Sequence, residues 1–223
     1  MKMQKLGGYS AIVSICLIVI LLAIAIPLAM RYGLNEQGAG LDPAKVAAAY
    51  SGSPMTVKAA VVIEILLGIL GLFVALALRE RMHAKAPNLM RLLVIAASAS
   101  CALTIINDML SFRSLAAMAG AADVSIYKPF LVMQNGLSTA SDNISGWVAL
   151  LIGVAALSTR ALPRFIGYVF LVIGILTVIG PALPSAGPAG LYIMIVIGLF
   201  YAVATIWLGI VLLREPKASP EKA

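Results

Sequence analysis

Three carboxylates interrupt long apolar stretches of the sequence, at Glu64, Asp108 and Asp142. A charged side chain at the centre of a membrane-spanning helix costs about 2.5–3.5 kcal/mol on insertion scales. Carboxylates in such positions therefore indicate a site, and several of them at one depth favour cations or protons as ligands. A pair such as Asp108 and Asp142 could also act as general acid and base.

A second group of polar residues lies in the stretch from Phe130 to Trp147. Its polar stripe has successive spacings of four, four and three residues, so we expect its members on one face of a helix. The members of this stripe are Gln134, Ser138, Asp142 and Ser145. Such a face cannot contact lipid tails at low cost, and it must contact other helices or water.

The candidate site combines this stripe with the other carboxylates and with Asn107. Its predicted members are Glu64, Asn107, Asp108, Gln134, Ser138, Asp142 and Ser145. In one interpretation these residues line a cavity that opens to the outside of the cell. In the other they form hydrogen bonds between helices, each worth only about 0.6 kcal/mol. Three carboxylates together with Asn and Gln side chains exceed what helix packing needs, which favours the cavity.

The remaining chemistry-bearing residues exclude several kinds of reaction centre. The single histidine, His83, lies in a charged loop, so intramembrane haem, zinc and Ser–His sites lack their ligands. Cys16 and Cys101 are isolated cysteines on different apolar stretches, and no phosphate- or dinucleotide-binding glycine motif occurs. We therefore predict no catalytic residue, no cofactor and no metal, and the sequence argues against an enzyme.

The composition identifies the class of protein that must position these residues. The chain has 223 residues, of which 62% are hydrophobic and 11% are charged, and its mean hydropathy is +1.04. Soluble domains contain about 45–50% apolar and about 25% charged residues. The composition predicts an all-α polytopic membrane bundle, and it excludes a disordered or disulfide-stapled chain.

Apolar runs bounded by charged or turn residues predict six membrane spans in a single domain of residues 1–214. The spans cover residues 9–30, 57–78, 92–112, 130–157, 165–183 and 189–213. We expect the first span to be retained rather than cleaved as a signal peptide, and the tail at 215–223 to be disordered. Asp42 and Pro43 predict the N-cap and first residue of a short helix that ends near Tyr50.

The basic residues predict the orientation of the spans. Eleven of the sixteen Lys and Arg residues lie in the N-terminal segment, the second and fourth loops and the tail, and five lie in the first and third loops. By the positive-inside rule, both termini are cytoplasmic. Glu64, Asp108 and Asp142 then lie in the outer half of the membrane or close to its middle.

Small residues four positions apart predict where helices approach each other closely. Such pairs are Gly71/Ala75, Gly136/Ala140 and Gly198/Ala202.

Three short segments of the C-terminal half resemble those of a known family. They are WVALLIG at residues 147–153, LPRFIGY at 162–168 and WLGIVLLR at 207–214. They are similar to the bacterial integral membrane family called domain of unknown function 4386. The resemblance implies a six-span architecture in the bacterial inner membrane. It implies no site residue, because the family has no assigned activity.

Two functions of different classes follow as hypotheses. In the leading one, the outward-facing cavity binds or permeates a small polar solute or cation. In the alternative, the chain is a non-catalytic accessory or sensory subunit whose polar stripe binds a partner helix. A membrane-embedded enzyme that uses the acid–base pair comes third. Membrane lipid is an expected partner, nucleic acid is not, and the sequence predicts no oligomeric state.

Reporter fusions test the predicted orientation. A reporter that is active only in the cytoplasm should be active when fused after Arg214 and inactive when fused after Lys45, because the more basic side stays inside. A periplasmic reporter that is active at the C-terminus would overturn the orientation.

Overall fold

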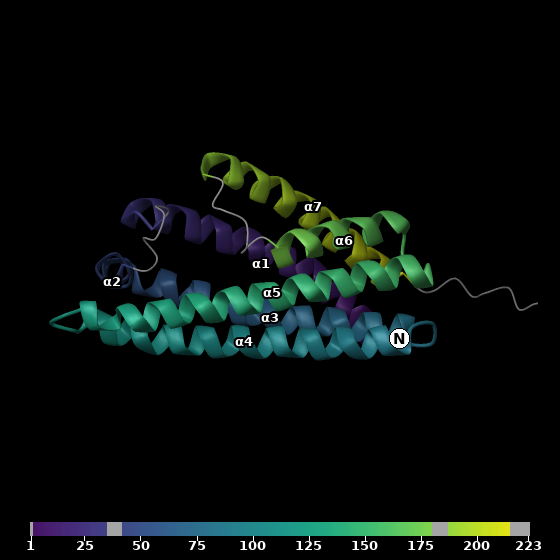
Figure 1. Cartoon of the computed structure of the whole chain (residues 1–223), viewed down its shortest axis with the longest axis horizontal. Coiled ribbons are helices and arrows are strands. Elements are labelled where there is room, and N and C mark those ends of the chain that lie inside the picture. The colour runs from purple at the N-terminus through teal and green to yellow at the C-terminus, as the bar shows by residue number, and fades with distance from the viewer. Residues whose placement is uncertain (1, 35–41, 180–186, 215–223) are drawn as a thin grey trace, which may run out of the picture.

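The computed structural model describes residues 2–34, 42–179 and 187–214, and every element within these ranges is a helix (Figure 1). The predicted disordered tail lies outside the described residues. In chain order the elements are α1 (Lys2–Tyr32), α2 (Pro43–Gly52), α3 (Pro54–Met82), α4 (Pro87–Ala119), the 3-10 turn η2 (Ser125–Tyr127), α5 (Lys128–Thr159), α6 (Arg164–Ile179) and α7 (Gly187–Leu213).

Four of these helical segments are long and apolar enough to cross a membrane. They are Met3–Tyr32, Pro54–Met82, Pro87–Met118 and Ser125–Thr159. They coincide with the first four predicted spans, which they exceed by a few residues at each end. Arg164–Ile179 and Gly198–Leu213 are shorter apolar helices within the fifth and sixth predicted spans. Large apolar side chains such as Val19, Leu22 and Ile26 are exposed on α1, as expected of a membrane-embedded bundle.

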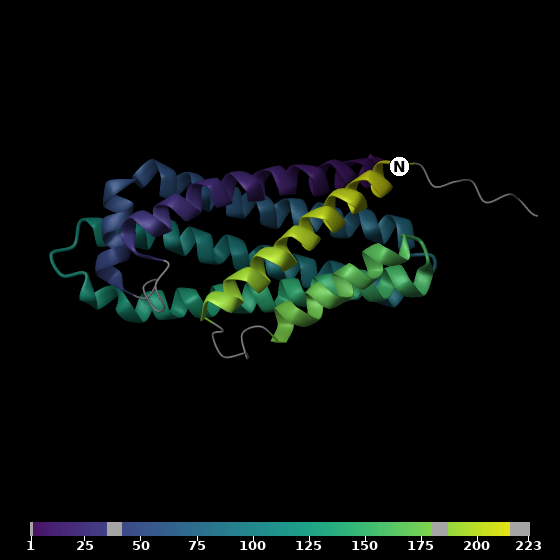
Figure 2. The same cartoon turned by 90° about the horizontal axis from the view of Figure 1, so that it is seen from above.

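The helices pack in the order α7–α1–α3–α4–α5–α6, and α6 also contacts α7. α1, α3, α4 and α5 run nearly parallel to the long axis, whereas α7 crosses the bundle obliquely (Figure 2). α5 and α6 form a long antiparallel contact, as their short connection predicts. The contact between α6 and α7 is smaller. The bundle is therefore joined less extensively at α6 and α7 than elsewhere.

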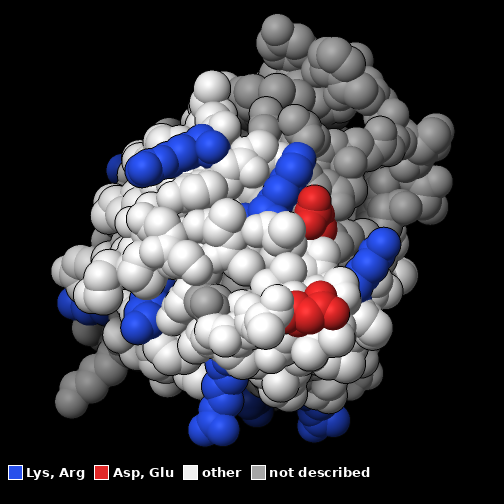
Figure 3. All heavy atoms as spheres, turned by 90° about the vertical axis from the view of Figure 1, so that its left-hand side faces the viewer, with Lys and Arg blue, Asp and Glu red and all other residues white. Residues whose placement is uncertain are grey.

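The short helix predicted between the first two spans is confirmed as α2. The Asp42 side chain accepts a hydrogen bond of 2.9 Å from the backbone N–H of Ala44, and Pro43 is the first helical residue. α2 packs mainly on α4, and Ala47 forms a small apolar cluster with Met118 and Leu131. It covers one end of the bundle, where basic side chains are distributed around the rim (Figure 3).

Basic side chains fasten helices together at the opposite end. Arg81 donates a 2.8 Å hydrogen bond to the carbonyl oxygen of Val211, near the end of α7. Lys85, in the α3–α4 turn, donates a 3.3 Å bond to the carbonyl oxygen of Thr159, the last residue of α5. Carbonyl groups in the last turn of a helix lack partners within the helix, so these cations satisfy them and complement the helix dipole.

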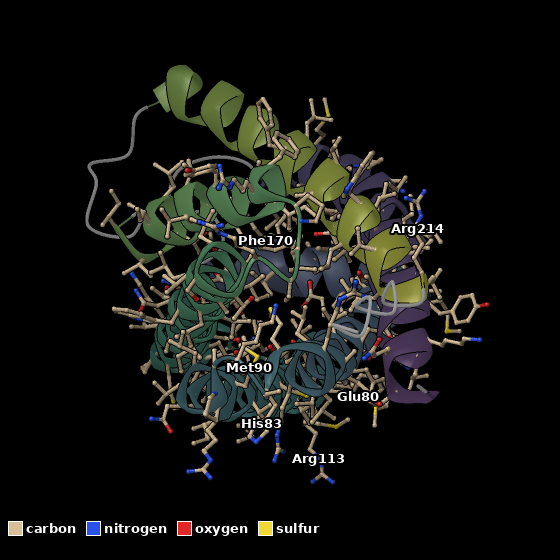
Figure 4. All side chains as sticks on the ribbon, turned by 90° about the vertical axis from the view of Figure 1, so that its right-hand side faces the viewer. Glu80, His83, Met90, Arg113, Phe170 and Arg214 are labelled. Carbon is tan, nitrogen blue, oxygen red and sulfur yellow. The ribbon has the colours of Figure 1, made fainter. Side chains whose placement is uncertain are left out.

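Seen from this end, the helices surround an apolar centre (Figure 4). Met90 is fully buried there and Phe170 is 3% exposed. The Phe170 ring meets that of Tyr201 on α7 edge-on, with the ring centroids 6.0 Å apart. The end that holds the α3–α4 turn is therefore closed by apolar packing.

Glycines make the α5–α6 contact very close. A Cβ atom added at Gly153 would lie 2.7 Å from the backbone nitrogen of Leu171, and one added at Gly174 would lie 2.6 Å from the backbone nitrogen of Leu150. Gly146 and Gly167 are equally crowded by the facing helix. Only glycine allows the two backbones to approach to this distance.

The glycines of the three predicted small-residue pairs do not mark a close approach, although Ala75 is buried at 1% exposure. A Cβ atom added at Gly71, Gly136 or Gly198 would meet nothing within 4 Å. Spacing alone does not determine which face of a helix contacts its neighbour, because these faces are uniformly apolar or small.

Two glycines of α5 provide a matched stability test. Gly153→Ala should destabilise the protein by about 1–3 kcal/mol, because the methyl group would collide with the backbone of α6. Gly136→Ala should be neutral or stabilising by up to about 1 kcal/mol, because the site is open and Ala favours the helix. Unfolding in detergent followed by circular dichroism measures both, and equal effects would refute the close contact.

Candidate functional site

Side-chain hydrogen bonds join α4 and α5 from the middle of both helices toward the end that carries α2. The hydroxyl oxygens of Ser100 and Ser145 are 2.7 Å apart, and those of Thr104 and Ser141 are 2.9 Å apart. Farther along, the Gln134 amide donates to the hydroxyl oxygen of Ser111. We call this row of bonds the polar seam.

The polar seam assigns a structural role to two of the predicted cavity residues. Gln134 is buried at 9% exposure and Ser145 bonds to Ser100, so both of them hold helices together. Ser138 is half-buried and lies between them on the side of α5 that faces α4. For these residues the structure supports the packing interpretation.

Glu64 on α3 and Asp108 on α4 form a second polar group, on facing sides of two neighbouring helices. Gly68 marks how close these helices are. A Cβ atom added there would lie 3.6 Å from Thr104 Cβ, so α3 and α4 are close. Because the helices are antiparallel, Glu64 and Asp108 lie opposite each other one turn farther along.

The surroundings of Asp108 leave acceptor atoms unused. The Asp108 side chain is 2% exposed and hydrogen-bonds to the neighbouring Asn107 side chain. Neither Asp108 Oδ2 nor Asn107 Oδ1 receives a hydrogen bond from a described N–H or hydroxyl group. Buried acceptors without donors are costly, so Asp108 and Asn107 are not fully satisfied by hydrogen bonds between the helices.

Asp142 differs from the rest of the stripe because it points away from the polar seam. The preceding Ser141 contacts α4, whereas the following Asn143 donates a 3.1 Å hydrogen bond to the carbonyl oxygen of Val178 in the last turn of α6. Asp142 lies between these two sides, on the part of α5 that is directed between α4 and α6. Nevertheless its side chain is exposed.

Two exposed polar residues that the predicted stripe omitted accompany Asp142. Asn135 and Thr139 precede it by seven and three residues and lie on the same side of α5. Deeper in the bundle, α6 covers this side through Gly146, but α6 is described only as far as Ile179. We call Asn135, Thr139 and Asp142 the open polar face. The sequence alone could have indicated this face, because Asn135, Thr139 and Asp142 are spaced four and three residues apart.

The residues of the predicted stripe point in gradually different directions, because an α-helix has about 3.6 residues per turn and not four. Each step of four residues advances the side chain by about 40° around the helix. Two such steps carry the direction from Gln134, which faces α4, to Asp142, which faces the interior. The four residues therefore span an arc of about 80° on α5, with Gln134 at the edge that contacts α4 and Asp142 at the other edge.

The described part of the chain holds no cluster of three His, Cys, Asp or Glu side chains that could bind a metal ion. Glu64, Asp108 and Asp142 thus form a carboxyl pair with a third carboxylate near it, not a three-ligand centre. Lys58 lies nearer the α2 end of α3, with its Nζ 5.7 Å from the centre of the Phe112 ring.

Asp123 contrasts with these carboxyl groups, because it lies in the fully exposed α4–α5 connection. The hydroxyl and backbone N–H of Ser125 hydrogen-bond to Asp123, and they lower the pKa of its carboxyl group. This residue is ionised at neutral pH and has no contact with the candidate site.

Comparisons of the chain with protein-family models, with curated proteins and with solved structures found no match. The resemblance to domain of unknown function 4386 therefore stays a prediction.

A double-mutant cycle tests the structural role of the polar seam. Thr104→Val and Ser141→Ala each remove one partner of the same hydrogen bond, so their effects on unfolding should be coupled by about 0.6 kcal/mol. The matched cycle of Thr104→Val with Ser138→Ala should show no coupling. If unfolding in detergent gives the same coupling in both cycles, the hydrogen bond does not contribute.

Proposed function

We propose that the chain is a six-span protein of the bacterial inner membrane with both termini in the cytoplasm. We further propose that its outer half holds a polar chamber that binds or permeates a small polar solute or cation. The open polar face of α5 forms one wall of this chamber, and the Glu64–Asp108 pair lies beside it. Membership of the domain of unknown function 4386 family is compatible with this proposal and adds no residue to it.

The exposure of Asp142 is the observation that supports the chamber most strongly. A side chain on the inner side of a helix remains exposed only if the neighbouring helices leave space there. Asp142 is directed between α4 and α6 and is exposed, whereas Gly146, one turn deeper, is buried against α6. An apolar void would leave this carboxylate unsolvated, so the space must hold water or a ligand.

The sign of the charges favours a cation or a neutral polar solute over an anion. Among the described residues, only acidic groups act electrostatically on Glu64 and Asp108, namely each other and Asp142. Carboxylate rings and clusters select cations in membrane pathways. An anion would be repelled from this wall.

The distribution of basic side chains supports the orientation. The structure brings Arg81, Lys85, Arg160 and the ends of α1 and α7 to one end of the bundle, opposite α2. The positive-inside rule then makes this end cytoplasmic and makes the α2 end the outer one. In this orientation the chamber opens outward.

The alternative is an accessory or sensory subunit, and one observation favours it. Asn135 and Thr139 of the open polar face are exposed, and a polar face cannot remain in contact with lipid. A polar helix of another protein could cover Asn135 and Thr139 there. In that case the face would be dry in the assembled complex.

Cysteine accessibility distinguishes the two functions. In otherwise cysteine-free protein, Thr139→Cys and Asp142→Cys should react with a membrane-impermeant maleimide added from the periplasmic side. Met133→Cys and Ala140→Cys are matched controls on the same helix, because these residues are also exposed but face the lipid side. They should stay unlabelled, since thiols in lipid are protonated and do not meet the reagent.

Labelling of the open polar face but not of the controls would agree with a water-filled chamber. Protection of all four positions in membranes, followed by labelling of Thr139→Cys after purification, would favour the partner helix instead. Protection in both preparations would refute the chamber and leave a dry packing surface.

A further inference from the structure

A pocket of about 370 Å³ lies far from the candidate site, at the end of the bundle that holds the α3–α4 turn. Its lining consists of Met3 at the start of α1 and of Leu76, Arg79, Glu80 and His83 on α3. Glu80 and His83 are labelled at this end of the bundle in Figure 4. The volume falls within the range of about 300–1,000 Å³ that small-molecule sites occupy.

A close contact between α1 and α3 closes the inner side of this pocket. A Cβ atom added at Gly7 would collide with Ala77 and would lie 3.0 Å from the carbonyl oxygen of Phe73. Met3 lies about one turn nearer the end of the bundle, where the two helices leave room between them. The pocket is therefore closed toward the core and open toward the surface.

The position of the pocket along α3 places it among lipid headgroups. α3 has 29 residues and is about 43 Å long, which matches a bilayer of about 40–45 Å including its headgroups. Arg79 is the first charged residue after the apolar run that ends at Leu78. The charged part of the lining thus lies at headgroup level, and Leu76 lies about one turn deeper, where acyl chains begin.

The Arg79 side chain is available to a ligand, unlike the basic side chains beside it. Arg81 and Lys85 donate to carbonyl groups of α7 and α5. Arg79 is exposed, and its guanidinium group makes no hydrogen bond or ion pair within the described part of the chain. A guanidinium group can hold a phosphate through two parallel hydrogen bonds.

His83 offers a second donor to the same phosphate. Its ring lines the pocket, and its Nδ1 is buried without a hydrogen-bond partner among the described residues. A buried N–H group without an acceptor is costlier than a bare lone pair, so the neutral ring carries its proton on Nε2. Arg79 and His83 are four residues apart on one face of α3, so one phosphate can contact both.

Glu80 gives the pocket a negative side next to Arg79. Successive residues of a helix point about 100° apart, so the two charged groups border the pocket from different directions. A carboxylate accepts several hydrogen bonds, so Glu80 can accept one from an ammonium group besides the interaction that it already has within the chain. A phosphate and an ammonium group are the two charges of a zwitterionic headgroup, whereas Glu80 would repel a purely anionic one.

The lining also indicates which kind of ammonium group fits. Quaternary ammonium groups are recognised by cages of aromatic rings. No Phe, Tyr or Trp is among the described residues that line this pocket. A primary ammonium group donates hydrogen bonds instead, and the Glu80 carboxylate accepts them.

We propose that this pocket binds the headgroup of a phospholipid that carries a primary ammonium group. Arg79 and His83 hold the phosphate, Glu80 holds the ammonium group, and the acyl chains extend along Leu76 and Met3. In the proposed orientation of the chain, this lipid belongs to the cytoplasmic leaflet. The leaflet rests on that orientation, whereas the headgroup preference does not.

Native mass spectrometry of the full chain in detergent tests the site, because it resolves bound lipids by their mass. The delipidated protein is titrated with phosphatidylethanolamine, phosphatidylcholine and phosphatidylglycerol that have the same acyl chains. We expect the first to bind about tenfold more tightly, as the gain of one charge-assisted hydrogen bond predicts. Phosphatidylcholine has no N–H group to donate, and phosphatidylglycerol has no ammonium group.

Two arginines provide a matched pair of variants. Arg79→Gln should weaken the binding of phosphatidylethanolamine about tenfold, because the phosphate loses its charged partner. Arg91→Gln should leave it unchanged, because Arg91 is exposed near the same end of the bundle but does not line the pocket. Glu80→Gln should abolish the preference over phosphatidylglycerol, since it removes both the repulsion and the partner of the ammonium group. Circular dichroism verifies that each variant is folded.

Equal binding of the three lipids, or equal weakening by Arg79→Gln and Arg91→Gln, would overturn the site and leave a general attraction to basic side chains. Inorganic phosphate is the competing ligand. If it displaces the lipid at equal concentration, the pocket belongs to a soluble phosphate compound, and the lipid proposal falls. Failure of the lipid site is distinct from failure of the proposed orientation or chamber, because reporter fusions and cysteine labelling test those.

Discussion

Unpaired polar groups are excluded from the hydrocarbon core of a membrane, and the rest of this structure depends on that constraint. Three pairs of polar side chains on α4 and α5 bond to each other across the interface, among them Ser100 with Ser145 and Thr104 with Ser141. Among the described residues, Asp108 Oδ2 and Asn107 Oδ1 receive no such bond, and Asn135, Thr139 and Asp142 are exposed on α5. The constraint therefore separates the polar residues that bond between helices from those that are not satisfied in this way.

α5 changes its mode of packing along its length, and this change creates the candidate site. In its second half, glycines bring it into backbone contact with α6, and no space is left for side chains or water. In its first half, the polar seam holds it to α4. Asp142 and Asn143 lie at the transition, where Asn143 satisfies a carbonyl group in the last turn of α6. One helix thus packs through glycines in one half and through polar side chains in the other.

The two ends of the bundle differ in a way that suits such a chamber. Arg81 and Lys85 bond to carbonyl groups near the ends of α7 and α5, so the end with the α3–α4 turn is held by charged hydrogen bonds and by apolar packing around Met90.

The sequence by itself determined the helical class, the positions of the long apolar helices and the N-cap of α2, because these depend on composition and on neighbours along the chain. It also found the three carboxylates, since a charge in an apolar run is visible without a structure. The pairing of Glu64 with Asp108, the separation of Gln134 from Asp142 and the crowding at Gly153 rather than Gly136 were decided only by tertiary structure. These features depend on how each helix is rotated against its neighbours, and a helix that is apolar on nearly every side carries little information about its own rotation.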